Sequence, residues 1–428
     1  MMNYPKYESY KDSGIDWLGV VPFEWTVERL GSNFSERRTK VSDIDFPALS
    51  VTKNGVVPQL ENAAKTKDGD NRKLVRKGDF VINSRSDRKG SSGVSSLDGS
   101  VSLINIILKP LENLQPEFCH HLLKSYAFIE EYYRVGRGIV ADLWTTRYDE
   151  MRTIMLAVPP IQEQNLIAKF LDQKTSQIDE AIRIKEKQIE LLKEQKQIMI
   201  QNAVTKGLDP NVRMKDSGVD WIGEIPEHWE VKRAKYLFTE VDERSKDGSE
   251  ELLSVSHMTG VTPRSEKNVS MFMSEDYTGS KLCKHNDLVI NIMWAWMGAL
   301  GVSNHKGIVS PSYGVFRQKQ ILSFHPAYLE FLLKTTKYIE HYNQVSTGLH
   351  SSRLRFYGHM FFAMKMGYPS YQEQEHIVNF LTEKNSETNN YIDVLEKQIE
   401  KLKEYKTTLI NSAVTGKIKV TPEMVGEA

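Results

Sequence analysis

The stretch that decides the fold runs from Ile161 to Val204 and reads IQEQNLIAKFLDQKTSQIDEAIRIKEKQIELLKEQKQIMIQNAV. Its 44 residues include no glycine and no proline, the two residues that most often interrupt a helix. Positions that advance by alternating steps of four and three residues are mostly apolar, and this spacing predicts a coiled-coil seam along one long helix. The predicted seam residues are Leu171, Ile178, Ile182, Ile189, Leu192 and Met199.

A similar helix sequence recurs near the end of the chain, 210 residues later. QEQNLIAKFL from Gln162 returns as QEQEHIVNFL from Gln372, and NAVTKG from Asn202 returns as SAVTGK from Ser412. The apolar spacing is kept, so the second helix also needs a partner for one of its faces. Its predicted seam residues are Leu381, Ile392, Leu395, Ile399, Leu402 and Leu409.

The repeat extends into the regions that precede the two helices. DSGIDWLGVVPFEW from Asp12 returns as DSGVDWIGEIPEHW from Asp216, and QPEFCHHLLKSYAF from Gln115 returns as HPAYLEFLLKTTKY from His325. Matched blocks in the same order indicate a duplicated unit. We therefore expect four parts: a globule over residues 1–160, a helix over 161–207, a second globule over 208–370, and a second helix with a C-terminal tail over 371–428.

Each globule is expected to have a mixed α/β fold. Apolar runs at Phe80–Asn83 and Val101–Leu108 predict strands, and Pro116 suits the first position of an amphipathic helix. Two equivalent units usually associate about a pseudo-two-fold axis, because the same surface then satisfies itself, and this arrangement makes the long helices antiparallel. Such a helix rises about 66 Å. We therefore expect an antiparallel two-helix coiled coil that separates the globules.

The composition is that of an average globular protein, with 40% hydrophobic and 26% charged residues. Basic and acidic residues balance at 56 each, so the net charge does not favour a generic polyanion binder. The only cysteines are Cys119 and Cys283, and their number and spacing argue against a disulfide framework and a structural metal site. No apolar run is long enough for a signal peptide or a membrane span. We expect a cytoplasmic protein without a membrane partner.

The repeated blocks resemble the conserved regions of the DNA-specificity subunits of type I restriction-modification enzymes. The resemblance rests on DSGIDWLGVVPFEW, PPIQEQNLIAKFL and LLKEQKQIMIQNAVTKG, each with its second copy, and it spans the whole chain. Ser370 and Tyr371 depart from it, because they stand before the second QEQ where Pro159 and Pro160 stand before the first. This departure leaves the entry angle of the second helix open.

The resemblance implies a function and a set of partners. Each globule would be a target recognition domain that reads one part of a split, asymmetric site in double-stranded DNA, and the coiled coil would set the gap between the parts. Two modification subunits, which carry S-adenosylmethionine and methylate adenine, and restriction subunits, which use ATP and Mg²⁺, would complete the enzyme. This chain itself would bind no cofactor.

No motif in the chain predicts catalysis. GRGIVA at Gly136 matches a dinucleotide-binding pattern in letters but follows a helical segment instead of a strand. The ExK pairs ending at Lys196 and Lys406 lie at the same repeat position within the long helices and lack a preceding Asp, so we interpret them as spacer residues. We expect no catalytic residue and no metal site.

Base recognition needs Arg, Lys, Asn or Gln side chains that reach the major groove. The first globule offers a basic run that ends in the loop NSRSDRKGSSG, for which a solvated loop face is the alternative interpretation. A second group lies before the long helix, beside Trp144. The predicted DNA-binding residues of this globule are Arg72, Lys73, Arg85, Arg88, Lys89, Arg137 and Arg147.

The second globule has NIMWAWMGALG at the place of that loop, so the two globules are expected to read different sequences. We interpret Trp294 and Trp296 as core residues, because apolar residues at this spacing are more often core than contact. The predicted DNA-binding residues here are Asn291, His350, Arg353 and Arg355. Tryptophans that recur in both copies are interpreted as structural or as a docking surface for a modification subunit: Trp17, Trp25, Trp221 and Trp229.

Two other functions stay open at this point. One is a duplicated coiled-coil adaptor that tethers two protein partners without reading DNA, although such an adaptor should keep its two globules alike. The other is a self-contained nuclease, which would need a catalytic motif that the sequence does not contain.

Overall fold

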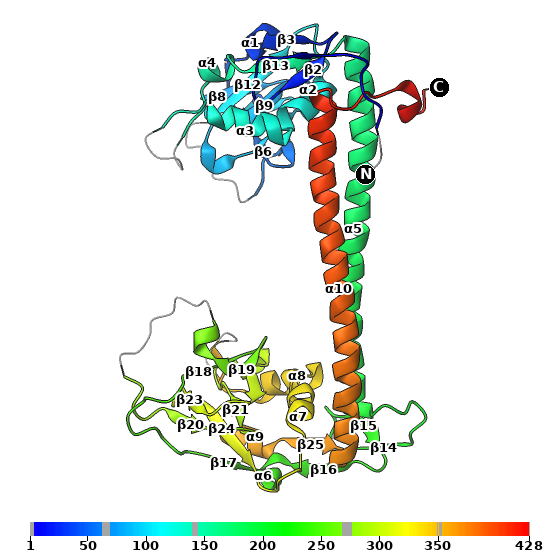
Figure 1. The fold of residues 1–428 in the computed structure, drawn as a ribbon. Helices are drawn as coiled ribbons and strands as arrows, with labels where there is room; N and C mark the ends of the chain where they lie inside the picture. The colour runs from blue at the N-terminus through cyan, green and yellow to red at the C-terminus, as the bar shows by residue number, and fades with distance from the viewer. Residues whose placement is uncertain are drawn as a thin grey trace. The chain divides into compact units, whose positions relative to one another are not determined.

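The structure is a computed structural model that describes residues 4–61, 69–138, 144–267, 276–348, 350 and 353–427. The chain divides into two compact units. The first unit comprises Met1–Glu186 and Leu395–Ala428, and the second comprises Lys187–Val394. Each unit therefore contains one globule and one segment of each long helix (Figure 1).

The long helices α5 (Ile161–Lys206) and α10 (Tyr371–Val414) pack together as a coiled coil (Figure 1). In the first unit, Lys406 Nζ donates to Asp179 at 2.7 Å and Lys185 Nζ donates to Gln398 at 2.6 Å. Residue numbers rise along α5 where they fall along α10, so the helices are antiparallel. The predicted fold class is confirmed.

A glycine in the left-handed conformation follows the end of each long helix. Gly207 follows α5 with φ of 78°, and Gly416 lies two residues after the end of α10 with φ of 72°. A left-handed residue just past a helix lets backbone N–H groups turn back onto the last free carbonyls, and glycine adopts that conformation without a Cβ clash.

The first globule is built on a four-stranded antiparallel sheet of order β10-β9-β12-β4. Those strands are β4 (Phe34–Glu36), β9 (Phe80–Asn83), β10 (Ser92–Val94) and β12 (Asn105–Pro110). The smaller sheets comprise β1 (Tyr10–Asp12) with β2 (Val20–Pro22), β3 (Thr26–Arg29) with β13 (Met155–Val158), β5 (Lys40–Val41) with β8 (Arg72–Val75) and β11 (Gly99–Val101), and β6 (Leu49–Thr52) with β7 (Gly55–Pro58). Its helices are α1 (Leu30–Asn33), α2 (Pro116–Lys124), α3 (Tyr126–Arg134) and α4 (Tyr148–Met151).

The single strand expected at Val101–Leu108 is two strands in different sheets. β11 ends at Val101 and pairs with β8, whereas β12 begins at Asn105 and pairs with β9. The break is a turn in which the Asn105 side chain donates to the carbonyl and the hydroxyl of Ser102, both at 3.1 Å. Local bonds of this kind compete with strand pairing.

The second globule repeats this topology, with a four-stranded sheet of order β17-β24-β21-β22. Those strands are β17 (Phe238–Glu240), β21 (Leu288–Ile290), β22 (Leu300–Val302) and β24 (Gly314–Gln318). The smaller sheets pair β14 (Met214–Asp216) with β15 (Glu224–Pro226), β16 (Glu230–Arg233) with β25 (Lys365–Tyr368), β18 (Leu253–Ser256) with β19 (Gly260–Pro263), and β20 (Lys281–Cys283) with β23 (Gly307–Val309). Its helices are α6 (Ala234–Leu237), α7 (Pro326–Leu333), α8 (Thr336–Val345) and α9 (Gly358–Ala363), with a 3₁₀ turn η4 (Ala295–Met297).

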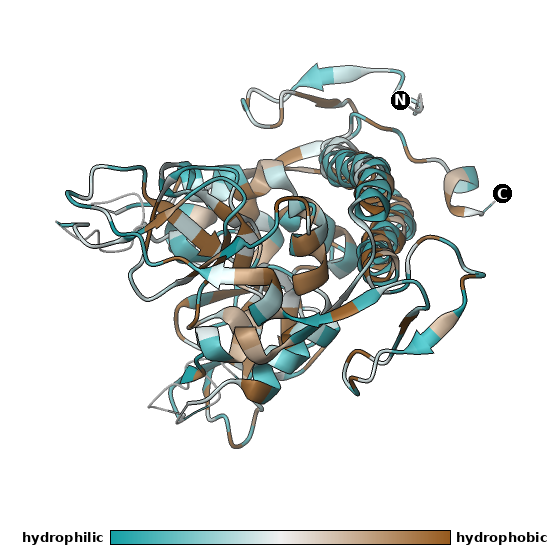
Figure 2. Ribbon diagram, turned by 90° about the horizontal axis from the view of Figure 1, so that it is seen from below, coloured by the Kyte–Doolittle hydropathy of each residue, from teal (hydrophilic) through white to brown (hydrophobic). Residues whose placement is uncertain are grey.

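The core of the second unit lies where the main sheet meets α7, α8 and the long helices. Trp229, Phe316, Tyr328 and Ile377 are among its fully buried members. Figure 2 shows apolar strands within the globules and mostly hydrophilic loops outside them. In the described part of the chain, no helix has both the length and the apolar character needed to cross a membrane.

Candidate nucleic-acid interface

The QEQ motif binds the start of α5 to the first globule. Gln164 is fully buried, and its side-chain nitrogen donates to the carbonyls of Asn113 and Pro159, both at 2.9 Å. Its side-chain oxygen accepts from the backbone N–H of Gln115, the N-cap residue of α2, at 2.9 Å. All polar groups of the amide are therefore used in orienting the helix.

The second unit forms the same contacts around Gln374. Its side chain donates to the carbonyls of Ser323 and Pro369 at 3.0 Å and accepts from the N–H of His325 at 2.8 Å. The sequence alignment is corrected here: Pro369 takes the place of Pro159 and Tyr371 that of Ile161, so only Ser370 departs from the proline pair. The departure does not change how the second helix is held.

The recurrent tryptophans belong to the same junction. Trp25 and Trp229 are buried, and their indole nitrogens donate to Glu163 and Glu373, the middle residues of the two QEQ motifs, at 3.1 Å in both units. Their role is structural. Trp17 and Trp221 are half-buried, and each packs on a ring of the helix pair beside it, Phe128 and Tyr338 respectively.

Three segments meet at one surface of the first globule, and the first of them lies far from the other two in sequence. Thr145 forms antiparallel bridges with Arg85, just after β9, and with Arg137, just after α3. The backbone N–H of Thr146 donates to Ser84 at 2.9 Å, which adds a third connection. We call Arg85, Arg137 and Arg147 the arginine cluster, since this pairing brings all three segments together.

The side chains of the arginine cluster are available to a ligand. All three residues are exposed, and the Arg137 side chain, 82% exposed, lies 3.6 Å from Glu150. Arg85 and Arg147 line a cavity of about 500 Å³, together with Arg38 and Lys73. Sequence reasoning missed Arg38, because the only local signal was the pair of arginines after β4.

Three other predicted DNA-binding residues of the first globule, Arg88, Lys89 and Lys73, differ in their surroundings. Arg88 is exposed, with Asp87 at 3.7 Å, and Lys89 pairs with Glu130 at 2.6 Å. Lys73 is largely buried, donates to the carbonyl of Asn105 at 2.7 Å, and has a pKa lowered by that burial.

Arg72 does not meet the requirement for a base-reading residue. It is 3% exposed, and its guanidinium donates to the hydroxyl of Ser100 at 2.8 Å and to the Ser100 carbonyl at 3.0 Å. Burial lowers the pKa of this arginine. The side chain joins β8 to β11 inside the globule, so the prediction that placed it at the DNA is corrected.

The second globule assembles the corresponding segments in the same way. The N–H of Phe356 donates to Ile292 at 2.9 Å, and Thr347 bridges to Arg355, as Arg137 bridges to Thr145 in the first globule. Met293, Thr347 and Tyr357 therefore stand at the positions of the arginine cluster. His350 and Arg353 are exposed nearby in sequence, whereas Arg355 is half-buried.

Two expectations for this surface are corrected. Asn291 is 4% exposed and donates inward to the Tyr313 hydroxyl at 2.9 Å, so it is not available to read a base. Trp294, expected in the core, is 47% exposed, while the neighbouring Ala295 is fully buried. The turn η4 inverts the expected arrangement, because it directs the small residue inward.

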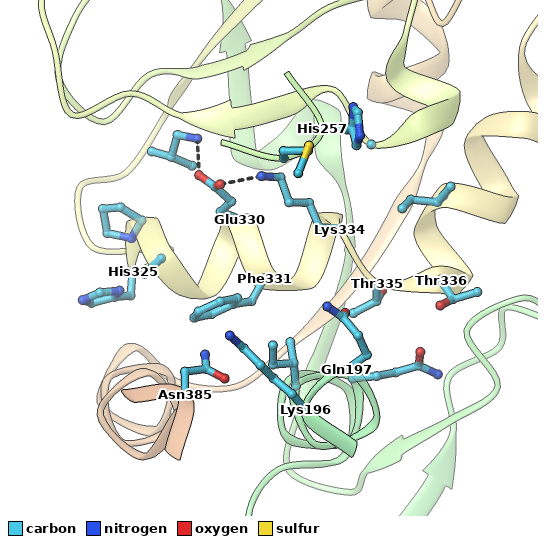
Figure 3. A pocket seen from close by; sticks show the side chains of 18 of the residues that line it. Lys196, Gln197, His257, His325, Glu330, Phe331, Lys334, Thr335, Thr336 and Asn385 are labelled. Atoms are coloured by element: carbon cyan, nitrogen blue, oxygen red, sulfur yellow. Dashed lines mark hydrogen bonds and ion pairs between the residues drawn. The ribbon is translucent and has the colours of Figure 1, made fainter. Parts of the chain in front are cut away.

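A larger cavity of about 760 Å³ lies in the second unit between α7 and the segments of α5 and α10 (Figure 3). Glu330 is held at its wall by Lys334 at 2.7 Å and by the N–H of Val302 at 3.0 Å. In the first unit His121, at the position of Phe331, instead bonds to Asp172 on α5 at 2.7 Å. None of the predicted DNA-binding residues lines this cavity.

The lysines of the two ExK pairs have a structural use. Lys406 bonds to Asp179 in the first unit, and Lys196 bonds to Asn389 at 2.8 Å in the second, which is the equivalent pair. Both lysines connect α5 to α10. Among the described residues, no group of His, Cys, Asp and Glu side chains is placed to hold a metal ion.

No family model matches the chain. Two curated relatives from Methanocaldococcus jannaschii match part of it. The "Putative type I restriction enzyme MjaX specificity subunit" is 24% identical over 253 residues, which are 54% of this chain and 56% of the relative. The "Type I restriction enzyme MjaVIII specificity subunit" is 27% identical over 287 residues, 62% of this chain and 63% of the relative. The match thus spans less than two thirds of either relative.

Solved structures share the fold over nearly the whole chain. A chain from the study of complex assembly and conformational transition of the type I R-M system covers 92% of this chain and 98% of its own length, with a TM-score of 0.66 and 16% identity. The HsdS subunit from Thermoanaerobacter tengcongensis covers 93% of this chain and 98% of its own length, with a TM-score of 0.54 and 16% identity. The resemblance expected from the sequence is confirmed.

Proposed function

We propose that this chain, whose curated relatives are type I restriction enzyme specificity subunits, is the DNA-specificity subunit of a type I restriction-modification enzyme. In this proposal residues 1–160 and 208–370 are target recognition domains, each reading one part of a split site. Residues 161–207 and 371–428 form the spacer between them.

The contrast between the two candidate surfaces is the observation that carries the proposal. The junctions around Gln164 and Gln374 match bond for bond, whereas the arginine cluster has Met293, Thr347 and Tyr357 at its equivalent positions. A protein adaptor that tethers two copies of one partner would keep both surfaces alike. Matching junctions combined with divergent exposed surfaces favour two different DNA half-sites.

The arginine cluster suits base and phosphate contacts. An exposed guanidinium can bind guanine O6 and N7 with two hydrogen bonds, or bind a phosphate as an ion pair. Three exposed arginines from separate segments can divide these tasks, one fixing the register and another reading a base. We propose Arg85, Arg137 and Arg147 as the main contacts of the first globule, with Arg88 and Lys89 beside them. For the second globule we propose His350, Arg353 and Arg355.

In this proposal the chain is a non-catalytic subunit. Modification subunits, two per complex, would supply S-adenosylmethionine and methylate adenine, and restriction subunits would use ATP and Mg²⁺ to cleave. The role of this chain would be to bind the site and hold those partners there.

Modified-base sequencing of the host genome, with the gene intact and deleted, tests the proposal. We expect adenine methylation at a two-part motif that disappears on deletion and returns with a plasmid copy of the gene. An unchanged pattern in a strain that makes both this chain and its modification partner would contradict the proposal and favour a protein adaptor.

A further inference from the structure

We propose that the second globule reads its half-site through the 5-methyl group of thymine, with Trp294 as the contacting side chain. The inference rests on the proposed function and adds the chemistry of recognition. It begins from the position of Trp294, directly after Met293, which stands where the first globule has Arg85.

Trp294 is exposed in a way that the other tryptophans are not. The residue is 47% exposed, and it is the only exposed tryptophan among the described residues, which include all seven. Leaving such a ring in water forgoes a large favourable burial term. The segment that bonds to Ile292 through Phe356 carries exposed polar residues, His350, Arg353 and His359.

The ring is held by its neighbours and needs little ordering on binding. Trp296 stacks on Trp294 with ring centroids 5.7 Å apart and an interplanar angle of 28°. Trp296 is itself fixed, because its indole nitrogen donates to the carbonyl of Met293 at 3.0 Å. An aromatic side chain supported in this way offers contact area at a low entropic cost.

The surface also has fewer base-reading donors than its counterpart in the first globule. Asn291 is turned inward, and Met293 and Tyr357 replace Arg85 and Arg147. The thymine methyl group is the one apolar feature that a base pair presents in the major groove. An exposed apolar ring on this surface therefore matches a half-site containing an A·T pair.

Replacing thymine by deoxyuracil tests the inference, because this change removes the methyl group and keeps every hydrogen-bonding atom. Duplexes carrying the site found by methylation mapping would be substituted one thymine at a time and bound to the complex of this chain with its modification subunits. We expect one or more thymines of a single half-site to show a loss of affinity of about three- to tenfold.

The variant W294A should bind the thymine and deoxyuracil duplexes equally. I321A is the matched control, since Ile321 is a 92% exposed apolar residue of the same unit outside the candidate surface. I321A should still bind the thymine duplex more tightly than the deoxyuracil duplex, as the unsubstituted chain does. W294F, which keeps an apolar ring, should retain part of the discrimination.

Three results would overturn the inference: equal binding at every substituted position, a half-site without thymine, or discrimination that persists in W294A. If the ring were a wedge inserted between bases, W294A would weaken binding to both duplexes alike. In each case sequence-specific binding and methylation at the site would remain, so the failure would not be that of the proposed function. Loss of all site-specific binding in the unsubstituted complex would instead contradict that function.

Discussion

Gln164 and Gln374 show how one buried amide can orient a helix of more than forty residues against a globule. Each amide uses its two donors on carbonyl groups and its oxygen on a backbone N–H, and both are inaccessible to water. A buried polar group left without its partner costs about 1–3 kcal/mol. The identity of this residue is therefore a requirement of the junction in both units.

The substitution Q164E should lower the free energy of unfolding by about 2–4 kcal/mol, because a carboxylate of the same shape would face two carbonyl oxygens. Q374E should have a similar effect in the second unit. Urea unfolding followed by circular dichroism measures the change. Q162E is the control, since Gln162 lies on the same helix and is exposed. Equal stability of Q164E and Q162E would contradict the assignment.

His120 makes the stability of the first unit depend on pH. Its Nδ1 accepts from the N–H of Val94 at 3.3 Å, which requires an unprotonated nitrogen. Burial, with help from the neighbouring His121 and Lys124, lowers its pKa from 6.5 to about 4. Between these values the unfolded chain binds a proton that the folded chain does not, so stability falls as the pH falls through this window.

Lowering the pH from 7 to 5 should reduce the free energy of unfolding by roughly 2 kcal/mol through His120. H120Q keeps an acceptor for Val94 and removes the titration, so it should be less sensitive to acid by about that amount. The measurement is urea unfolding of both proteins at each pH. Identical pH dependence of the two would show that His120 does not titrate in this window.

At the scale of elements, α5 carries apolar residues both on its seam and outside it. The predicted seam residues of α5 and α10 are buried or half-buried. Ile184, Leu191 and Ile198, which lie outside that series, are about half exposed, at 47%, 49% and 54%. Packing against α10 thus separates residues of the same chemistry into two classes.

I178A and I184A compare these classes on one helix. Because Ile178 is 7% exposed, I178A should lower the free energy of unfolding by about 2–4 kcal/mol. I184A should lower it by less than about 1 kcal/mol, since Ile184 is half exposed. The loss of helical circular dichroism in urea measures both. A cost for I184A equal to that of I178A would mean that the α5 seam is misassigned.

For the whole molecule, Arg147 of the first candidate surface and Trp294 of the second imply different dependences on salt. Neutralising phosphates releases counterions, so each lost phosphate contact lowers the slope of log affinity against log salt by about one. An apolar contact leaves that slope unchanged. The first globule is therefore expected to contribute charge, and Trp294 of the second to contribute contact area.

R147A should reduce the salt slope of binding by about one, while W294A should weaken binding without changing the slope. Because the residues lie in separate units, the double variant should lose affinity by the sum of the two single losses, within about 0.5 kcal/mol. Titrations of the complex on the intact site at several salt concentrations test this. Strong non-additivity would contradict independent half-site reading.

The sequence by itself determined the architecture. The duplicated blocks, the glycine- and proline-free helices and their seam spacing all express local or periodic rules, which hold wherever the segment lies in space. The strand at Phe80–Asn83 and the helix start at Pro116 follow from the same rules, and both occur as predicted. The prediction of a single strand over Val101–Leu108 was wrong, because a turn at Ser102–Asn105 competes with strand pairing.

Only the tertiary structure decided which side chains reach the surface. Arg72 and Asn291 were reasonable base readers by residue type, yet each bonds inward, while Trp294 was expected inside and lies outside. The arginine cluster exists because backbone pairing joins the segment at Ser84 and Arg85 to the one at Thr145 and Thr146, about sixty residues later. Burial depends on which neighbours a folded chain brings to a residue, and that information is absent from its local sequence.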